Sequence, residues 1–151
     1  MKISTTKLNL FLLFKLPAAF FTGVRATYID NKTCEVKVKH RWVNQNPFKS
    51  MFWAVQGMAA ELTTGALMLM KIKASGESIS MLVTNNKGHF KKKALGRITF
   101  VCQQGDVIDA VIKKAIETGE GQTIWLHAKG FDASGDEVSD FSFEWTLKMR
   151  T

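Results

Sequence analysis

The sequence predicts an α+β fold in which an antiparallel sheet wraps around one long central helix. Residues 50–71 contain strong helix formers, no proline and a single carboxylate, Glu61, so this helix is apolar on all sides. A helix of that kind is buried. Six further segments alternate apolar and polar residues, and short turns join several of them, which favours antiparallel strands.

The first third of the chain predicts a helix followed by two strands. Residues 1–22 form an amphipathic helix, capped near Ser4 to Thr6, that packs on the sheet or on a partner subunit. Strands are expected over 23–30 and 34–43. In the second strand, the residues expected to face the core are Cys34, Val36, Val38, His40 and Trp42.

The rest of the chain predicts four more strands and a short second helix. Ser50 is the expected N-cap of the central helix. Strands are expected over 78–84 and 97–103, with a turn at 85–88 between them, and over 123–132 and 137–149. The short helix lies near 106–118, where Asp106 is the expected cap and Gly119 ends the helix.

The length of the central helix decides how these elements pack. A helix of roughly 20 residues is about 30 Å long, which is the diameter of a small domain. It must therefore run through the middle, inside the concave face of the sheet. This six-stranded antiparallel sheet around a helix is the hotdog fold. An open sheet with the helix on one flat face would leave apolar helix surface uncovered. We expect one domain over residues 1–151.

The composition limits the classes of function. A net charge of +8 fits either a solvated basic surface or an anionic partner. Nucleic acid is not expected, because only Phe90 lies among the densest basic residues and strand binding needs interleaved aromatics. No apolar run reaches the ~20 residues of a membrane span. His40 and His127 lack neighbouring ligands, so no metal site is expected.

The cysteines and the N-terminus bear on the compartment. Cys34 and Cys102 lie in apolar strand-like segments outside any CxxC pair. This favours free buried thiols in a reducing compartment, and we expect a cytoplasmic protein. Basic residues before the apolar stretch 8–14 could also be read as a signal peptide. Lys15 and Pro17 interrupt that stretch, which favours the helix.

Glu61 is the candidate functional residue of the central helix. A lone carboxylate in an apolar helix is costly unless it is paired, protonated or close to solvent. Glu61 could bind a buried backbone group or a partner subunit, or it could lie at the bottom of a ligand tunnel. In the second case its neighbours at helical spacing line the tunnel: Gly57, Met58, Thr64 and Gly65. The two glycines favour a close approach by a ligand or a second helix.

Residues 46–61, NPFKSMFWAVQGMAAE, resemble the signature of hotdog acyl-CoA thioesterases of the phenylacetyl-CoA thioesterase type. In that signature an Asn precedes a loop, His-Gly-Gly opens the central helix, and an acidic residue follows on that helix. Here Asn46 precedes the loop and Glu61 is the acidic residue. Phe52, nine positions before Glu61, stands in place of the His, and Trp53 and Ala54 replace the glycines.

Nearly the whole chain also resembles an uncharacterised thioesterase-like branch of the hotdog superfamily, through Gly23–Arg25, Asn46-Pro47 and Met58–Gly65. The resemblance implies a homodimer, or a dimer of dimers, that binds an acyl thioester such as an acyl-CoA in an interface tunnel without a further cofactor.

By the same resemblance, the first free N–H groups of the helix, at Phe52 to Ala54, polarise the thioester carbonyl. Glu61 acts as general base or nucleophile, and Asn46 positions substrate or water. Because the His-Gly-Gly is replaced, a second function stays open. This is a non-catalytic hotdog module that binds an acyl or lipid-like ligand or only forms a dimeric scaffold.

Lys91, Lys92, Lys93 and Arg97 form the densest basic patch. It could bind the phosphates of coenzyme A. It could equally be a solvated strand edge, where lysines prevent unwanted strand pairing.

Overall fold

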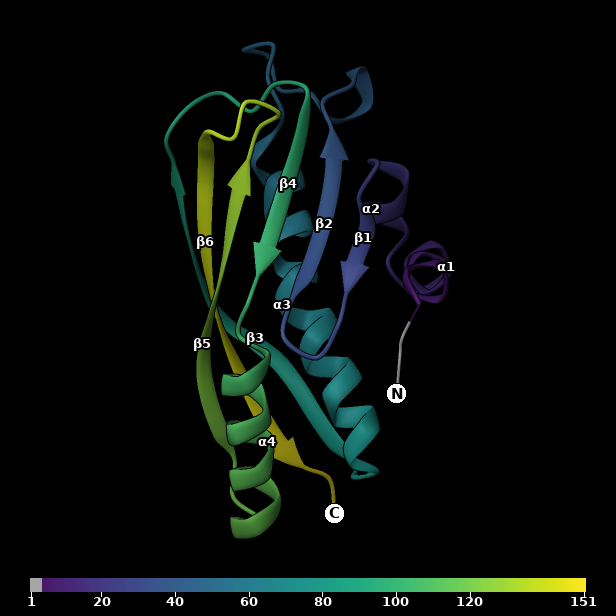
Figure 1. Ribbon diagram of the computed structural model, residues 1–151, viewed down its shortest axis with the longest axis vertical. Helices are drawn as coiled ribbons and strands as arrows, with labels where there is room; N and C mark the ends of the chain where they lie inside the picture. The colour runs from purple at the N-terminus through teal and green to yellow at the C-terminus, as the bar shows by residue number, and fades with distance from the viewer. Residues whose placement is uncertain (1–3) are drawn as a thin grey trace.

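The computed structural model of the protein describes residues 4–151 and has the predicted architecture (Figure 1). A six-stranded antiparallel sheet curls around one long helix, α3 (Trp53–Ser75), which confirms the hotdog prediction. The strands run in the order β1-β2-β4-β5-β6-β3. Their bounds are β1 (Arg25–Ile29), β2 (Cys34–Lys39), β3 (Ile79–Phe90), β4 (Arg97–Cys102), β5 (Gln122–Phe131) and β6 (Glu137–Met149).

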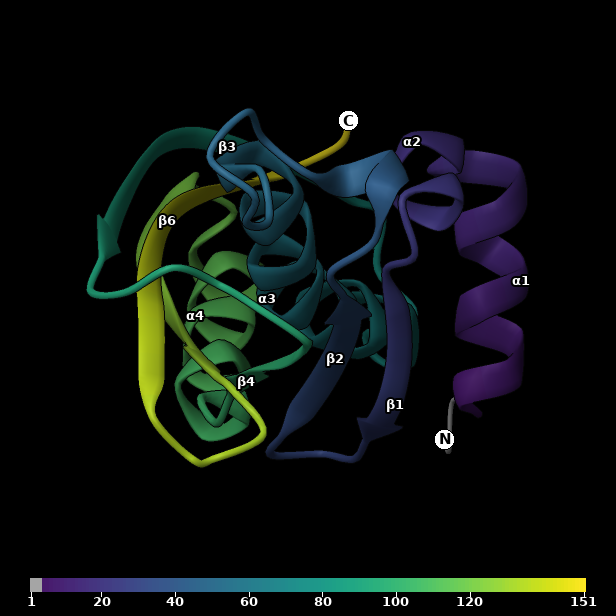
Figure 2. The same ribbon diagram turned by 90° about the horizontal axis from the view of Figure 1, so that it is seen from above.

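The core lies between α3 and the concave face of the sheet (Figure 2). Ala59, Leu67 and Met68 of α3 are fully buried there. One stripe of α3 stays half-buried or exposed, at the four-residue spacing that places side chains on one helix face. The stripe consists of Trp53, Gly57, Glu61, Gly65 and Leu69. The stripe runs past β6, whose Phe141 and Trp145 are the nearest neighbours of Gly57 and Gly65.

The helix α3 begins and ends later than predicted. Ser50 is not its N-cap, because the Ser50 hydroxyl lies in a loop, 3.0 Å from the Nδ2 of Asn46. Phe52 is the N-cap residue and its side chain makes no capping hydrogen bond. The helix continues beyond residue 71 to Ser75, where Gly76 takes the left-handed conformation (φ 73°) that ends it.

The N-terminal helix predicted over 1–22 is two helices, α1 (Thr5–Lys15) and α2 (Pro17–Phe21). They separate because Pro17 has no N–H and begins a new helix at its first position. Ser4 caps α1, as predicted, by accepting from the Lys7 N–H at 3.2 Å. Residues 1–3 of the predicted helix lie outside the described residues.

Helix α1 lies beside β1 at one edge of the sheet (Figure 2). The Asn9 side chain completes the hydrogen bonding of this edge. Its Nδ2 donates to the Ala26 carbonyl at 2.9 Å, and its Oδ1 accepts from the Ala26 N–H at 2.8 Å. The opposite edge strand, β3, pairs with β6 alone among residues 4–151.

Two strands differ from the prediction. Strand β2 ends at Lys39, not 43, because residues 42–44 form a 3-10 turn. The Asn44 side chain stabilises this turn: its amide donates to the Lys39 carbonyl and its oxygen accepts from the Arg41 N–H. Trp42 therefore does not face the core, and its side chain is 83% exposed. Strand β3 continues through the predicted turn at 85–88 to Phe90, because β6 is long enough to pair with all of it.

Helix α4 (Gly105–Thr118) forms where a short helix was predicted, and Gly119 ends it with φ 69°. Asp106 lies in its first turn and is not the cap; Gln104 precedes the helix instead. The predicted free thiols are confirmed: Cys34 and Cys102 are buried opposite each other on β2 and β4. Burial raises the pKa of the Cys34 thiol to about 12 and that of Cys102 to about 11, so both are unreactive near neutral pH.

Candidate functional site

Glu61 lies in the wall of a cavity of about 240 Å³ between α1, α3 and the strands β3 and β6. We call this the Glu61 cavity. Every other lining residue is apolar: Leu8, Phe11 and Leu16 near α1, Leu62, Gly65, Ala66 and Leu69 of α3, Met81 of β3, and Trp145 of β6. No pattern in the sequence predicts that the N-terminal helix closes the cavity around Glu61.

The environment of Glu61 favours its protonated form. Burial raises the pKa of the Glu61 carboxyl from its usual 4.5 to about 7, and no charge or hydrogen bond offsets this effect. The carboxyl is therefore close to half ionised at neutral pH. An acid or base works best when its pKa lies near the working pH, so Glu61 is suited to accept a proton there.

The residues around Glu61 fix the shape of the cavity. The Trp145 indole donates from Nε1 to the Thr64 hydroxyl at 3.0 Å, and that hydroxyl donates to the Glu61 carbonyl at 2.8 Å. A Cβ at Gly65 would lie 3.2 Å from the Trp145 ring and 3.6 Å from Oε1 of Glu61. Gly65 therefore provides the space in which the ring and the carboxyl meet. A Cβ at Gly57 would lie 3.6 Å from the nearest neighbouring atom, which is an ordinary van der Waals contact.

The start of α3 offers two free backbone donors, not the three expected. The Phe52 N–H donates to the Asn44 carbonyl at 2.9 Å. The Val55 N–H donates back to the Phe52 carbonyl at 3.0 Å. Within residues 4–151 the N–H groups of Trp53 and Ala54 have no backbone or side-chain partner. These two groups carry the partial positive charge of the helix N-terminus.

Asn46 shapes the loop before α3. Its Oδ1 accepts from the N–H groups of Phe48 and Ser50 at 2.9 and 3.2 Å. Its Nδ2 lies 3.0 Å from the Ser50 hydroxyl and 3.3 Å from the Met51 carbonyl. The amide is thus occupied within its own loop, and its geometry holds the chain where the helix begins.

A second cavity, of about 390 Å³, lies at this end of α3, and we call it the helix-start cavity. It brings together Asn46, Phe52 and Trp53 with the predicted lysines. Its lining consists of Asn46, Pro47, Phe48, Ser50, Met51, Phe52, Trp53, Gln56, Phe90, Lys91, Lys92, Lys93 and Ala94. Trp53 does not fill it, because the Trp53 side chain is 57% exposed.

The basic patch is largely neutralised by nearby carboxylates. Lys91 pairs with Glu137 at 3.0 Å, and Lys92 pairs with Asp132 at 2.8 Å. Lys93 instead donates to the Phe48 carbonyl at 3.2 Å and has no carboxylate partner within residues 4–151. The fourth predicted residue, Arg97, lies on β4 and does not line the helix-start cavity.

Gln56 belongs to the helix-start cavity although the sequence reasoning did not single it out. It is 4% exposed, and its Oε1 accepts from the Ser139 hydroxyl of β6 at 2.8 Å. Its Nε2 donates to the Met51 carbonyl at 3.4 Å. The available signal was a polar residue in an apolar helix, one turn after the helix start. Its contacts fix the first turn of α3 to the sheet.

The predicted catalytic parts thus lie in two separate places within one chain. Glu61 lines one cavity, while Asn46, Phe52 and Trp53 line the other. Of the four residues predicted to line a tunnel, Gly65 lines the Glu61 cavity, whereas Gly57, Met58 and the buried Thr64 do not. Eight positions separate the free N–H of Trp53 from Glu61, which is about 12 Å along the helix axis.

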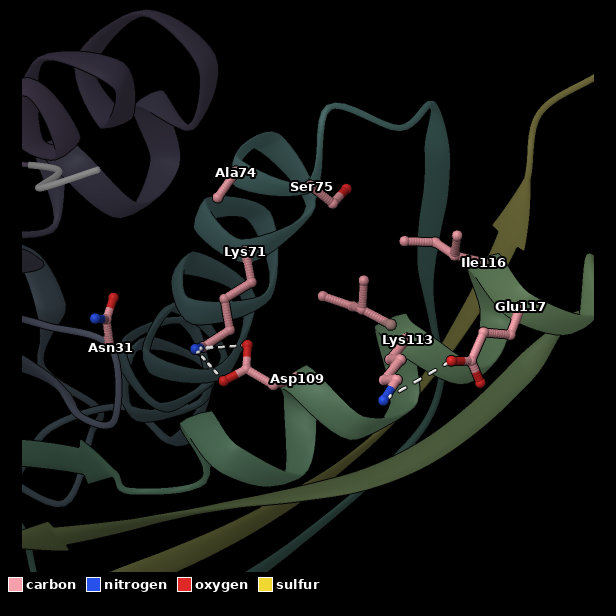
Figure 3. A pocket seen from close by; sticks show the side chains of 9 residues that line it. Asn31, Lys71, Ala74, Ser75, Asp109, Lys113, Ile116 and Glu117 are labelled. Carbon is pink, nitrogen blue, oxygen red and sulfur yellow. Dashed lines mark hydrogen bonds and ion pairs between the residues drawn. The ribbon is translucent and has the colours of Figure 1, made fainter.

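A third cavity, of about 570 Å³, lies between α3 and α4 and contains none of the predicted residues (Figure 3). Lys71 reaches across it from α3 and pairs with both carboxylate oxygens of Asp109 on α4, at 2.8 and 2.9 Å. Lys113 and Glu117 form a further pair on its α4 side. The Lys71–Asp109 pair joins the two helices, whereas the Lys113–Glu117 pair lies within α4.

Residues 4–151 contain neither a cluster of metal ligands nor a membrane-spanning helix. Residues 4–151 contain no group of three or more His, Cys, Asp or Glu side chains placed to hold a metal ion. Within the same residues, no helix combines the length and the apolar character needed to cross a membrane.

Solved structures share this fold at low sequence identity. A protein of unknown function from Pseudomonas aeruginosa, PA5026, described as a probable thioesterase, has a TM-score of 0.83 at 22% identity over 99% of both chains. A protein of unknown function from Chlorobaculum tepidum has a TM-score of 0.82 at 17% identity over 97% of this chain and 94% of its own. The thioesterase HI1161 from Haemophilus influenzae has a TM-score of 0.73 at 10% identity over 99% and 93%.

No curated protein matches the sequence. A family profile does match, over residues 6–147, which include nearly all of α1, all of α2 to α4 and nearly all of the sheet. The chain therefore belongs to the DUF4442 family, a domain of unknown function.

Proposed function

We propose that the protein is a thioesterase that hydrolyses an acyl thioester, such as an acyl-CoA, with Glu61 as general base. The observation that carries the proposal is the unpaired carboxyl of Glu61, which has a pKa of about 7 and lies in an otherwise apolar cavity. An acyl chain fits the apolar lining, and the carboxyl can accept the proton of an attacking water. The shared fold with thioesterases supports the proposal.

The free N–H groups of Trp53 and Ala54 would polarise the thioester carbonyl. As water attacks the carbonyl carbon, its proton moves to Glu61 and negative charge develops on the carbonyl oxygen. Donors already aimed at that oxygen stabilise the charge. The C–S bond then breaks, the thiolate leaves and takes up the proton, and the carboxylic acid is released.

These parts can act together only if a second copy of the chain completes the site. The carboxyl and the free N–H groups of one chain are about 12 Å apart along α3. The carbonyl oxygen must lie about 3 Å from the N–H groups, and the attacking water must lie about 3 Å from both the carbonyl carbon and the carboxyl. The proposed site therefore combines Glu61 of one subunit with the helix start of the other, in a tunnel at the interface of a homodimer.

The unpaired edge of β3 supports the homodimer. This strand is 12 residues long, and beyond β6 it has no partner within residues 4–151. A long open edge invites pairing with another chain, and two β3 strands related by a two-fold axis would satisfy each other. Exposed Phe52, Trp53 and Phe90 would be covered by the partner. We expect a dimer, or a dimer of dimers, in light scattering at micromolar concentration; a monomer would contradict this assembly.

Lys93 would contact a phosphate of coenzyme A at the mouth of the tunnel. It lines the helix-start cavity and, unlike Lys91 and Lys92, has no carboxylate partner in the described chain. The free buried thiols of Cys34 and Cys102 fit a reducing compartment such as the cytoplasm.

A specific observation favours the second function, a non-catalytic module that binds an acyl chain. The Asn46 amide is occupied by its own loop and so lacks a free group for water or substrate. In this case the Glu61 cavity would take up an acyl chain without cleaving the thioester.

A panel of acyl-CoA substrates of different chain length distinguishes the two functions. Thiol release is measured for the wild type, for Glu61→Gln, and for the control Glu77→Gln, which alters an exposed carboxylate just beyond α3. Hydrolysis lost in Glu61→Gln and kept in Glu77→Gln supports catalysis by Glu61. Equal hydrolysis in all three proteins excludes Glu61 as the base. Tight acyl binding without any thiol release supports the second function.

A further inference from the structure

The outer face of α1 and α2 is apolar although much of it is exposed to solvent. We define this face by Leu10, Phe14, Leu16 and Phe21, whose side chains are 55%, 72%, 41% and 65% exposed. The opposite side of α1 buries Leu8 and Leu12 against the protein. Because α1 is apolar on both sides, it is suited to lie between the protein core and a second apolar phase.

The charges around the outer face are all positive. No Asp or Glu occurs before Asp30 in the sequence. Lys7 and Lys15 of α1 are exposed, and Lys7 lies three and seven positions before Leu10 and Phe14, on the same side of the helix. The outer face therefore combines exposed apolar side chains with lysines.

Trp42 is a further exposed apolar side chain close to α2. The Asn44 Nδ2 donates to the Thr22 carbonyl at 2.9 Å and so ties the 3-10 turn to the end of α2. That turn presents Trp42 with its side chain 83% exposed. Tryptophan is enriched at membrane–water interfaces, where its ring contacts lipid and its N–H contacts water.

We propose that the outer face of α1 and α2 docks on the surface of an anionic membrane. The apolar side chains would enter the boundary between headgroups and acyl chains, and Lys7 and Lys15 would contact acidic headgroups. With 11 residues, α1 is about 16 Å long and can only lie on the surface. The docking adds to the proposed hydrolysis and does not depend on it.

Charge favours a membrane over a second copy of the chain as the occupant. Two outer faces packed together would place Lys7 and Lys15 of both copies close to one another, with no carboxylate on either face to offset them. An anionic bilayer supplies both the apolar phase and the negative charge. The dimer proposed above uses the β3 edge, whereas the outer face lies on the side of α1 that points away from the rest of the protein (Figure 2).

The position of α1 also connects the outer face to the Glu61 cavity. Leu16 belongs to the outer face and lines the cavity as well, next to Leu8 and Phe11. A docked protein would thus hold the cavity against the membrane, separated from it by one helix.

Vesicle co-sedimentation of the full chain tests the proposal. Vesicles of equal parts phosphatidylglycerol and phosphatidylcholine are compared with vesicles of phosphatidylcholine alone. We expect the wild type to bind the anionic vesicles and to dissociate as salt is raised. The double variant Phe14→Ser/Phe21→Ser should bind at least about tenfold more weakly, because burial of a Phe side chain contributes more than a tenfold factor.

Matched variants on α4 serve as controls. Val107→Ser/Ile116→Ser removes two exposed apolar side chains far from α1, at 47% and 37% exposure, and should bind as the wild type does. Lys7→Gln/Lys15→Gln should weaken binding more than tenfold, at about fivefold per lysine, whereas Lys113→Gln/Lys114→Gln should have a smaller effect. Circular dichroism and thermal melts establish that each variant is folded.

Several outcomes would overturn the proposal. The first is a wild type that ignores the anionic vesicles. The second is equal loss of binding in Lys7→Gln/Lys15→Gln and in Lys113→Gln/Lys114→Gln, which would indicate attraction by net charge alone. The third is a lipid-free wild type whose mass in light scattering falls when Phe14→Ser/Phe21→Ser is introduced, because the face would then be covered by a second copy.

Discussion

Replacing Glu61 by glutamine should change how the stability of the protein depends on pH. Burial raises the pKa of the folded carboxyl to about 7, against 4.5 for a glutamate side chain that is exposed to water in the unfolded chain. Between these values the folded state binds more protons than the unfolded state. The free energy of unfolding therefore falls as pH rises from about 4.5 through about 7.

The size of the effect follows from the two pKa values. Their difference, at about 1.4 kcal/mol per pKa unit, gives about 3 kcal/mol, of which somewhat more than 2 kcal/mol is lost between pH 5 and pH 8. Glutamine cannot ionise, so Glu61→Gln should lack this loss. Relative to the wild type, the variant should gain about 2 kcal/mol of stability on going from pH 5 to pH 8.

Urea unfolding at pH 5, 6, 7 and 8 measures the difference directly. The other carboxylates contribute equally to both proteins, so subtracting the two curves isolates Glu61. Glu77→Gln is the control and should follow the wild type, since Glu77 is exposed. If the curves of the wild type and Glu61→Gln run parallel over this range, Glu61 is not desolvated and the reasoning about its pKa is wrong.

Three further predictions concern packing, and urea unfolding measures each. Gly57→Ala should stabilise the protein by up to about 1 kcal/mol, because alanine favours the helix and its Cβ would make only an ordinary contact at 3.6 Å. Gly65→Ala should destabilise the protein, because its Cβ would crowd the Trp145 ring at 3.2 Å. Equal effects of the two substitutions would contradict the assigned role of Gly65. Gly105→Ala should lower the free energy of unfolding by more than about 2 kcal/mol, since a Cβ there would overlap the Asn31 backbone. A stability within about 0.5 kcal/mol of the wild type would refute that contact. Asp109→Asn should lower the free energy of unfolding more than Lys71→Met does. The first substitution leaves the nearly buried Lys71 ammonium without its carboxylate, whereas the second leaves only Asp109, which is 58% exposed. The reverse order would mean that the pair is not buried.

The sequence predicted the fold because its strongest patterns are local. The strict alternation of residues 137–149 appears unchanged as β6, and the apolar helix around Glu61 is α3. The differences come from contacts between distant segments. Strand β3 passes through a predicted turn because β6 pairs along it, and Trp42 leaves the predicted strand because Asn44 binds the end of α2.

The candidate site could be predicted only in part for the same reason. The isolation of Glu61 in an apolar helix was visible in the sequence, and the structure places that residue in an apolar cavity. The contribution of α1 to this cavity could not be predicted, since it depends on how Leu8 and Phe11 pack across the sheet edge. Nor could the sequence indicate that the Phe52 N–H is occupied, because its partner is the Asn44 carbonyl in a separate turn.

The pH dependence of thioester hydrolysis tests the role of Glu61 most directly. The value of kcat/KM is measured from pH 5 to pH 9 with the acyl-CoA that the wild type hydrolyses best. A general base must be ionised to act, so kcat/KM should rise with pH and level off above a midpoint near 7, the pKa of the Glu61 carboxyl. Glu61→Gln should lose both the rate and this midpoint. A rate that stays level across the range, or a midpoint that persists in Glu61→Gln, would contradict the proposed role of Glu61.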